Sequence, residues 1–373
     1  MKNDNPYQFV GERDYVHGSV PAVGVLVVNL GTPEAPTAKA LRPYLREFLG
    51  DRRVIELPRA MWWLILNGIV LVRRPKQSAE LYAQVWTKEG SPLRVYTEKV
   101  TDVIRQALQS RYGTPVVVEY AMRYGQPSVA HGLNKLRQAG ARRILILPMY
   151  PQYSATCGGT VFDAVAAELT QWRWVPELRT IMQFHDEPGY IRALANSVRE
   201  LWDKDGKPDK LVMSFHGIPK RYFQNGDPYH CHCQKTGRLL ATALGLTKDE
   251  YIVSFQSLFG KEEWIRPYTD ETMKALGAAG VEKVDAICPG FTADCLETLE
   301  EIDEQNRELF LHAGGKQFRY IPALNDRPDF VATLLDLIER NLAGWVETNE
   351  SYQAAVVAEA ARDSERAYRA MNE

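Results

Sequence analysis

The strongest constraint on the fold is a series of short apolar runs, rich in β-branched residues, that alternate with stretches of helical periodicity. The runs lie at 23–29, 116–121, 143–148, 178–184, 210–215, 251–255 and 283–288. Most are continuously apolar rather than alternating, which is typical of parallel strands buried on both faces. Helical patterns separate them, for example at 129–139 and 190–202. The alternation predicts an α/β fold of βαβ units around parallel sheets.

A repeated turn indicates that the 373 residues form two similar halves. One apolar run ends in Asn29-Leu-Gly-Thr-Pro33 and another in Phe215-His-Gly-Ile-Pro219. Ligands of open parallel sheets bind outside the carboxyl ends of the strands, so both turns should face one cleft. We expect a polar N-terminal segment over 1–20, a first half over 21–186, a second half over 187–330, and C-terminal helices over 331–373 with an exposed end.

Composition excludes several classes of protein. The net charge is -2, so no basic field points to nucleic acid. The five cysteines are an odd number in a long chain, which argues against a disulfide framework. The polar residues 1–20 have no apolar core of a secretory signal. We therefore expect a cytoplasmic protein.

Residues 60–72 form the most apolar stretch, interrupted only by Asn67 and Gly68. Its length suits a buried core helix better than a membrane span. Paired tryptophans within it, and cations on both sides, equally suit a helix that lies at a membrane interface. The flanking cations are Arg52, Arg53, Arg59, Arg73, Arg74 and Lys76. From the residues alone both interpretations stand.

His216 follows a buried strand and precedes a Gly-Ile-Pro turn, which places an imidazole at the expected cleft. Such a residue can act in acid–base chemistry or bind a metal, although a lone histidine is more often structural. A second strand end, at Cys288, leads into an acidic stretch. Asp294, Glu297, Glu301 and Glu304 recur at helical spacing and predict one acidic helix face. For Glu300 and Glu304 we expect a solvated position; Glu297, nearest the cleft, is the functional candidate.

Other polar and aromatic groups follow strands or lie in turns, at 90–97, 120–124, 150–154 and 255–264. They could line a large apolar pocket with an arginine for an acidic substituent, or pack as ordinary loops. The run His230-Cys-His-Cys233 could hold a metal, but it lacks a second ligand pair.

Taken together, these motifs resemble ferrochelatase, the terminal enzyme of haem synthesis, in its proteobacterial form. The resemblance runs from about Val23 to Trp345 and rests on "NLGTPEAPT", "GSPLRVYT", "AMRYG", "YPQYSATCGGT", "SFHGIPKRY", "QSLFGKEEWIRPYT" and "CPGFTADCLETLEEI". It implies two Rossmann-like halves, each a parallel sheet flanked by helices, with the active site in the cleft between them. It also favours a membrane-touching lip at 60–72 over a core helix.

The resemblance implies an enzyme that inserts Fe²⁺ into protoporphyrin IX and releases two protons. It implies His216 and Glu297 as the catalytic pair, and His216, Glu297 and Glu301 as groups that meet the metal. Positions that match porphyrin contacts are Leu30, Arg123, Tyr124, Ser154, Gln256 and Trp264. Alternatives are a chelatase for coproporphyrin III or a sirohydrochlorin-type ring, and a non-catalytic porphyrin or haem carrier. The acidic row disfavours a carrier.

The sequence departs from the family pattern at two places. Cys295 stands where many family members have histidine, so no second imidazole is expected beside Glu297. The C-terminal tail has no cysteine, so no animal-type [2Fe–2S] cluster is expected. A cluster built from Cys157, Cys231 and Cys233 is a minor alternative. The expected partners are porphyrin, ferrous iron and a membrane surface, with no nucleic acid; the oligomeric state stays open.

Overall fold

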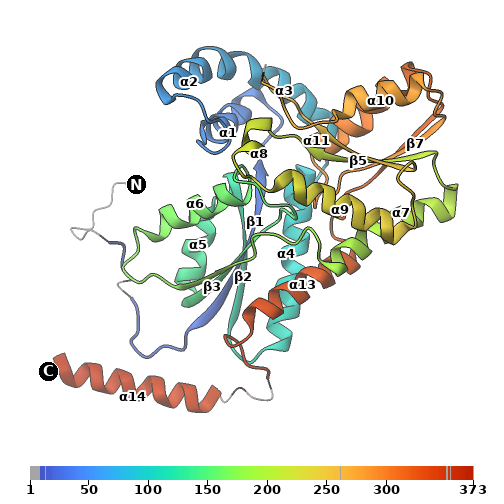
Figure 1. The fold of residues 1–373 in the computed structure, drawn as a ribbon. Coiled ribbons are helices and arrows are strands. Elements are labelled where there is room, and N and C mark those ends of the chain that lie inside the picture. The colour runs from blue at the N-terminus through green and yellow to red at the C-terminus, as the bar shows by residue number, and fades with distance from the viewer. Residues whose placement is uncertain (1–8, 13, 261, 350–351, 353, 373) are drawn as a thin grey trace.

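Two parallel four-stranded sheets form the frame of the molecule (Figure 1). The computed structural model describes residues 9–372 except 13, 261, 350–351 and 353. The first sheet has the order β2-β1-β3-β4 and the second has β6-β5-β7-β8. Both orders are the same when each half is counted from its own first strand, and every neighbouring pair is parallel. The predicted fold class is therefore confirmed. The strands are β1 Ala22–Thr32, β2 Val116–Gly125, β3 Ala141–Pro148, β4 Glu177–Thr180, β5 Lys210–His216, β6 Tyr251–Gln256, β7 Lys283–Ile287 and β8 Gln317–Ile321.

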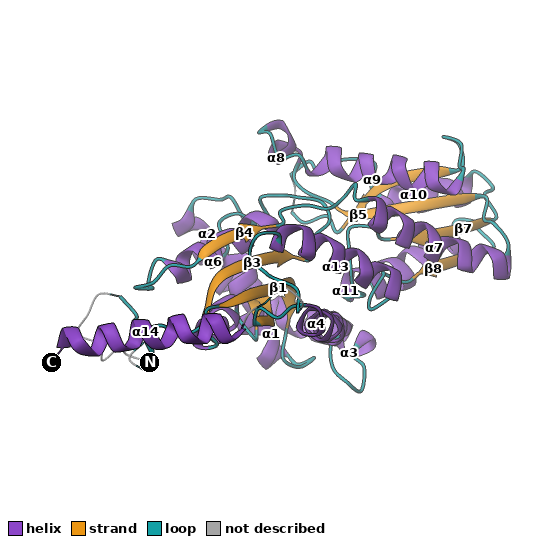
Figure 2. Cartoon of the chain, turned by 90° about the horizontal axis from the view of Figure 1, so that it is seen from below, coloured by secondary structure: helices purple, strands orange, loops and turns teal. Residues whose placement is uncertain are grey.

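Helices connect the strands and cover both faces of each sheet (Figure 2). Those of the first half are α1 Ala38–Gly50, α2 Arg59–Ile65, α3 Leu71–Val85, α4 Pro92–Arg111, α5 Val129–Gln138 and α6 Gly158–Leu169. Those that follow are α7 Pro188–Asp205, α8 Lys220–Gln224, α9 Tyr229–Leu244, α10 Thr269–Ala278, α11 Leu296–Leu299, α12 Arg307–His312, α13 Pro328–Leu342 and α14 Ala354–Asn372. Two π-helical turns, Leu66–Val70 and Glu301–Asn306, interrupt the α-helical geometry.

One continuous core joins the two halves. It contains Val25 and Leu145 from the first sheet, Leu211 from the second, and residues of α4, α7, α9 and α13 such as Leu334. Separate clusters cover the outer faces, one under α5 and α6 and one under α10 and α12. Because both faces are covered, the strands are apolar throughout, as their sequences predict. The boundary that we propose at 186/187 falls in the connection between β4 and α7.

The topology directs β1 and β5 towards the functional cleft. The chain goes from β1 to its neighbour β2 on one side and then crosses back over β1 to β3 on the other side, and the second sheet repeats this order around β5. Such a switch point is where open α/β sheets bind ligands. Two glycines allow neighbouring segments to approach closely there. Gly31 has a φ of 113°, and a side chain on it would meet the carbonyl oxygen of Tyr124; one on Gly217 would meet the Gln256 carbonyl and the Trp264 ring.

The lip, residues 60–72, is neither a buried core helix nor a fully exposed one. It comprises α2, the first π turn and the start of α3. Trp62, Leu66, Val70 and Leu71 are buried against α1. Its other face is exposed and apolar, with Met61, Trp63, Leu64, Ile69 and Val72 all more than 45% exposed. Of the two interpretations that the residues left open, the buried core helix is therefore wrong. Within the described residues no helix is long and apolar enough to cross a membrane.

The acidic stretch at 294–304 is not one uninterrupted helix. Cys295 caps α11, so Asp294 precedes the helix, and the second π turn begins at Glu301. Asp294 is buried and Glu300 is only 6% exposed, whereas Glu304 is exposed. The expected solvated position is thus wrong for Glu300. The expected shared face is also wrong for Asp294, because that carboxylate turns towards the end of β8.

Candidate active site

His216 is the last residue of β5 and is half-buried at the cleft. Its Nδ1 lies 2.6 Å from the carbonyl oxygen of Gly217. A carbonyl oxygen can only accept, so Nδ1 carries a proton, and in the neutral ring Nε2 keeps a lone pair. The ring centre lies 6.4 Å from that of Trp264, which is 9% exposed. The strand end therefore presents an imidazole whose free nitrogen can take a proton or meet a metal ion.

Gln256 ties His216 to the acidic turn. It is the last residue of β6 and pairs with His216 in the sheet register. Its Nε2 donates to the carbonyl oxygen of Glu297 at 2.6 Å and to Glu301 Oε2 at 3.3 Å. Its own Oε1 accepts from Ser214 Oγ at 2.7 Å. The structure thus brings His216, Gln256, Glu297 and Glu301 to one place, from segments separated by forty residues or more.

Ser257 binds both carboxylate oxygens of Glu301. Ser257 donates to it from both the backbone nitrogen, at 2.6 Å, and the hydroxyl. Ser257 has a φ of 64°, a left-handed conformation that is uncommon for residues other than glycine and that often marks functional sites. Burial raises the pKa of Glu301, and the hydrogen bonds from Ser257, together with the positive charge that His216 carries when it is protonated, oppose that rise. The carboxyl can therefore exchange a proton nearer neutral pH than an ordinary glutamate.

Glu297 lies in the first turn of α11 and lines a small cavity between the halves. The volume of the cavity is about 10 Å³, far below the usual range for ligand pockets. Its walls come from β1, α1, α3, α4 and the turn before α11: Leu30, Gly31, Thr32, Tyr44, Tyr82, Ser91, Leu93, Cys295, Leu296 and Glu297. Sequence reasoning missed Tyr44 and Tyr82, which lie on helices without a recognisable motif. Ser91 and Leu93 belong to the "GSPLRVYT" stretch already noted.

Burial dominates the electrostatics of this cavity. It raises the pKa of both Tyr44 and Tyr82, and the nearby Glu297 charge raises them further. The pKa of the Cys295 thiol is raised for the same two reasons, so this cysteine stays a neutral thiol. Glu297 thus faces neutral hydroxyl and thiol groups rather than cations. A positive charge that enters the cavity is stabilised by this carboxylate.

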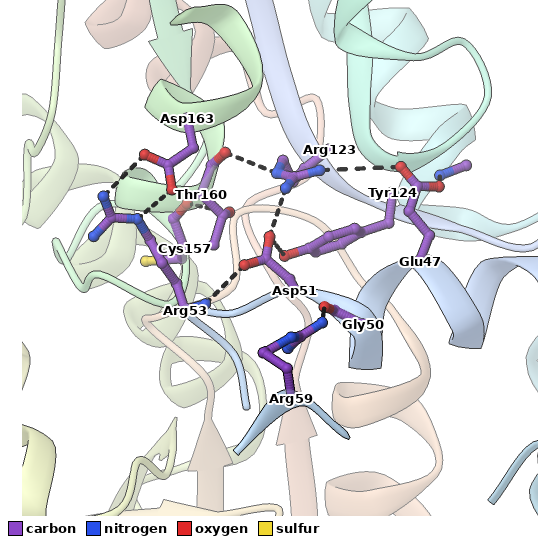
Figure 3. A network of polar contacts seen from close by, with 11 residues as sticks. Glu47, Gly50, Asp51, Arg53, Arg59, Arg123, Tyr124, Cys157, Thr160 and Asp163 are labelled. Atoms are coloured by element: carbon purple, nitrogen blue, oxygen red, sulfur yellow. Dashed lines mark hydrogen bonds and ion pairs between the residues drawn. The ribbon is translucent and has the colours of Figure 1, made fainter. Parts of the chain in front are cut away.

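Arg123 and Tyr124, at the end of β2, are bound to other protein groups (Figure 3). Arg123 Nη2 lies 2.5 Å from Asp51 Oδ2, and its Nε donates to the Thr160 carbonyl at 2.8 Å. The hydroxyl of Tyr124 donates to the same Asp51 oxygen at 3.0 Å. These two residues do not line the cavity with Glu297. Their contact with porphyrin stays a prediction.

Ser154 hydrogen-bonds across the junction of the two halves, to Asp227. It is 1% exposed, and its hydroxyl donates to Asp227 Oδ2 at 2.9 Å. The Ala155 backbone nitrogen donates to the same oxygen at 2.8 Å. In this arrangement Ser154 fastens a loop of the first half to the turn before α9. A role in substrate binding stays a prediction for Ser154 as well.

The His230-Cys-His-Cys233 run forms the start of α9, and its side chains point in different directions. Cys231 is exposed, Cys233 is buried, and all five cysteines are free thiols. Burial raises the pKa of Cys157, to about 12, and of Cys233. In the part of the chain that the structure describes, no three His, Cys, Asp or Glu side chains form a ready metal-holding group, and this includes the set around His216.

His232 instead stacks on His185, with ring centres 3.8 Å apart and planes 8° from parallel. The Nδ1 of His232 accepts the Tyr153 backbone N–H at 3.2 Å, while the buried Nδ1 of His185 has no hydrogen-bond partner. Burial, and then the second imidazole, lower the pKa of His185 to about 4. The two rings are therefore neutral at physiological pH, and they join the loops after β3 and β4 to α9.

We expect this histidine pair to make folding stability depend on pH. The His185 pKa falls from 6.5 when unfolded to about 4 when folded, so the unfolded state binds more protons between these values. Stability is then lost as pH falls below 6.5. From pH 7 to pH 5 the loss should be about 2 kcal/mol in urea unfolding. His185→Phe should remove most of this pH-dependent loss of stability. His131 lies on the exposed face of α5, and His131→Phe should leave the loss unchanged. An equal loss in the His185 variant would contradict this assignment.

A larger hollow of about 580 Å³ lies elsewhere, between the N-terminal segment and α14. It is open to solvent and lined by residues such as Tyr15, Arg142 and Trp174. Arg142 stacks over both rings and pairs with Glu12. Neither strand end of the cleft contributes to it, so the hollow is not the candidate active site.

Comparisons with known proteins agree with this geometry. A family model described as Ferrochelatase matches residues 22–342. A ferrochelatase of Thioalkalivibrio sulfidiphilus is 58% identical over 357 residues, which cover 96% of this chain and 97% of that protein. A ferrochelatase of Marinobacter nauticus is 53% identical over 340 residues, 91% of each chain.

A solved structure of SirB from Bacillus subtilis with Fe³⁺ has a similar fold. Its TM-score is 0.54 at 11% identity, and the match covers 86% of this chain and 96% of that one. At this identity the likeness supports the two-sheet fold alone. The family model and the relatives at 53% and 58% identity, by contrast, cover the cleft and nearly all of the chain, and they show that it belongs to the ferrochelatase family.

Proposed function

We propose that His216, Glu297 and Glu301 carry out iron insertion in this chain. As a ferrochelatase, the chain inserts Fe²⁺ into protoporphyrin IX and releases two protons, which gives protohaem. The assignment of these residues rests on one observation: all three lie next to Gln256. That side chain pairs with His216 in the sheet and donates to both the Glu297 carbonyl and the Glu301 carboxylate.

The reaction explains why these groups are needed. The pyrrole nitrogens hold two protons that must leave as Fe²⁺ enters, and their lone pairs lie in the plane of the ring. The site must distort the ring to expose them, with strain supplied by binding energy. The free Nε2 of His216 can accept a pyrrole proton or meet the metal, since Fe²⁺ takes imidazole ligands.

The carboxylates have complementary roles. Glu297 lies among neutral groups in the cavity, where its charge stabilises the incoming cation. Glu301 has a raised pKa because it is buried, and it is suited to take up or release a proton. The incomplete ligand set suits a metal that is a substrate, because the ion must pass into the macrocycle.

Anaerobic insertion of Fe²⁺ into protoporphyrin IX, followed by the absorbance change, tests this function. We expect turnover with protoporphyrin to exceed turnover with coproporphyrin III or a sirohydrochlorin-type ring. Glu297→Gln should lower kcat by about 10²-fold or more while porphyrin binding is kept, because it removes the charge but preserves the shape. Faster turnover with another ring would reassign the substrate. Tight porphyrin binding without turnover by the wild type would favour a carrier.

We also propose that the lip contacts a membrane from the cytoplasmic side. Support comes from its exposed face, where Trp63 is 63% and Leu64 64% exposed beside the exposed cations Arg59, Arg73 and Arg74. Apolar side chains at the acyl boundary with cations at the headgroups are typical of interfacial helices. A porphyrin could then pass between the membrane and the cleft without crossing water.

Replacing Trp63 and Leu64 together by aspartate should weaken binding to vesicles that contain anionic lipid. Burial of one large apolar side chain contributes about 1.5–3 kcal/mol, so we expect at least a tenfold loss in co-sedimentation. Phe162→Asp is the matched control, because Phe162 is 51% exposed on α6 and outside the lip. Equal binding of the lip variant and the wild type would exclude this surface.

A further inference from the structure

The connection between α1 and α2 links the lip to both halves of the molecule. We call residues 51–56 the lip base. The segment contacts β2 and α6 in the first half and α8 in the second. Above it, Trp62 Nε1 and Arg59 Nη2 donate to the carbonyl oxygens of Leu49 and Gly50, at 2.7 Å each. Any movement of the lip away from the cleft must therefore act on the lip base.

Asp51 is the central residue of the lip base (Figure 3). Its side chain is 8% exposed and accepts three hydrogen bonds. Arg123 Nη2 and the Tyr124 hydroxyl reach Oδ2 from β2, at 2.5 and 3.0 Å. The backbone nitrogen of Arg53 reaches Oδ1 at 2.8 Å. A buried carboxylate with a guanidinium partner is costly to break by removal of one partner, so it fixes this segment to the first sheet.

Contacts nearer the surface also attach the lip base, to α6 and α8. Arg53 pairs with Asp163 of α6 through Nε and Nη2, at 2.6 and 2.9 Å. From α8 in the second half, the Tyr222 hydroxyl donates to the Val54 carbonyl at 3.2 Å. Arg221 donates to Glu56 at 2.7 Å. These outer ion pairs are more exposed than the Asp51 pair and should contribute less.

A layer of aromatic rings connects Asp51 with the cavity. Tyr124 lies 5.0 Å from Phe48, and Phe48 lies 6.3 Å from Tyr44, between ring centres. Tyr44 lines the cavity together with Glu297. The lip also reaches the second half, where Phe259 packs on its buried face and Arg74 stacks over that ring at 4.8 Å. A macrocycle is far larger than this cavity, so the walls formed by α1 and α3, which carry the lip between them, must move apart for it to enter and must then return.

We propose that Asp51 is a positioning residue for iron insertion: through Arg123 and Tyr124 it returns the lip to the closed position that holds the porphyrin against Glu297. Asp51 touches neither the metal nor the ring. It acts through the lip base and through the aromatic layer behind the cavity. The expected effect on iron insertion rests on the function proposed above; the attachment of the lip by Asp51 does not.

Asp51→Asn tests the proposal, because it keeps the size and an acceptor oxygen but removes the charge that pairs with Arg123. We expect amide exchange at 59–72 to become at least about tenfold faster in the free protein, since the lip opens more often. The KM for porphyrin should rise about tenfold or more, whereas the KM for Fe²⁺ should stay within about twofold. A merely structural residue would lower the folded fraction and leave both KM values unchanged.

Asp163→Asn is the matched control, since it breaks the exposed ion pair of the same lip base. We expect exchange and both KM values of that variant to stay within about twofold of the wild type. Unchanged exchange at 59–72 in the Asp51 variant would overturn the proposal, as would an unchanged KM for porphyrin. If the wild type has no iron-insertion activity, the exchange measurement still decides whether Asp51 holds the lip, and the proposed function fails separately.

Discussion

His216→Ala is expected to lower kcat for iron insertion by about 10²–10⁴-fold, the usual contribution of a positioned acid–base group. The variant removes the only atom at the end of β5 that can accept a pyrrole proton, the Nε2 left free by the bond from Nδ1 to Gly217. Porphyrin affinity should change by less than about threefold, because the cavity walls come from other segments. Stopped-flow absorbance gives kcat, and quenching of porphyrin fluorescence gives the affinity.

His131→Ala is the matched control for this prediction, because His131 is exposed on α5, far from the end of β5. Its kcat should equal that of the wild type. Turnover within threefold of the wild type by the His216 variant would show that Nε2 is not the proton acceptor. If kcat falls together with porphyrin affinity, the imidazole contributes to binding rather than to the chemical step.

The sequence predicts the fold and the strand ends because both depend on local patterns. Continuous apolar runs identify parallel strands, and a turn that contains Gly217 identifies where one of them must end. The position of His216 follows, since a parallel strand presents its last residue at the cleft. These inferences need no knowledge of how distant segments pack.

The acidic stretch shows where such reasoning fails. A helical wheel assumes one unbroken α-helix, but the chain begins its helix after Asp294 and contains a π turn from Glu301 to Asn306. The extra residue in a π turn rotates the following side chains relative to those before it, and such turns are frequent at functional sites. Glu300 is buried, which raises its pKa, and it accepts a hydrogen bond from Gln305 within this turn. No spacing rule in the sequence anticipates these contacts.

The cavity and the lip base illustrate a second limit. Tyr44, Tyr82 and Glu297 meet only because α1, α3 and α11 converge between the halves. Likewise, Asp51 pairs with Arg123 across seventy-two positions of the chain. Such contacts depend on tertiary packing, for which one sequence gives no periodic signal.

Asp294→Ala is expected to cause the largest loss of stability among substitutions near the site. Asp294 is 6% exposed and accepts from the Tyr320 hydroxyl at 2.6 Å and from Asn325 Nδ2 at 2.7 Å. The Thr298 hydroxyl and the Ala323 backbone nitrogen donate to it at 3.2 Å. Removing the carboxylate leaves at least two buried donors without partners, at about 1–3 kcal/mol each. We therefore expect the free energy of unfolding to fall by roughly 2–6 kcal/mol in urea titrations followed by circular dichroism.

The same substitution should reduce activity in the molecules that remain folded. Asp294 fixes the turn that leads into α11, and Glu297 lies three positions on, so a shift of about 1 Å in that turn can cost about 10²-fold in kcat. Asp294→Asn, which keeps the shape and one acceptor oxygen, should lose less than half as much stability as the alanine variant. Glu304→Ala, at the exposed end of the acidic stretch, should change stability by no more than about 0.5 kcal/mol. If the Asp294 and Glu304 variants were equally stable, the buried carboxylate would not be anchoring this turn, and the placement of Glu297 would have to depend on Gln256 alone.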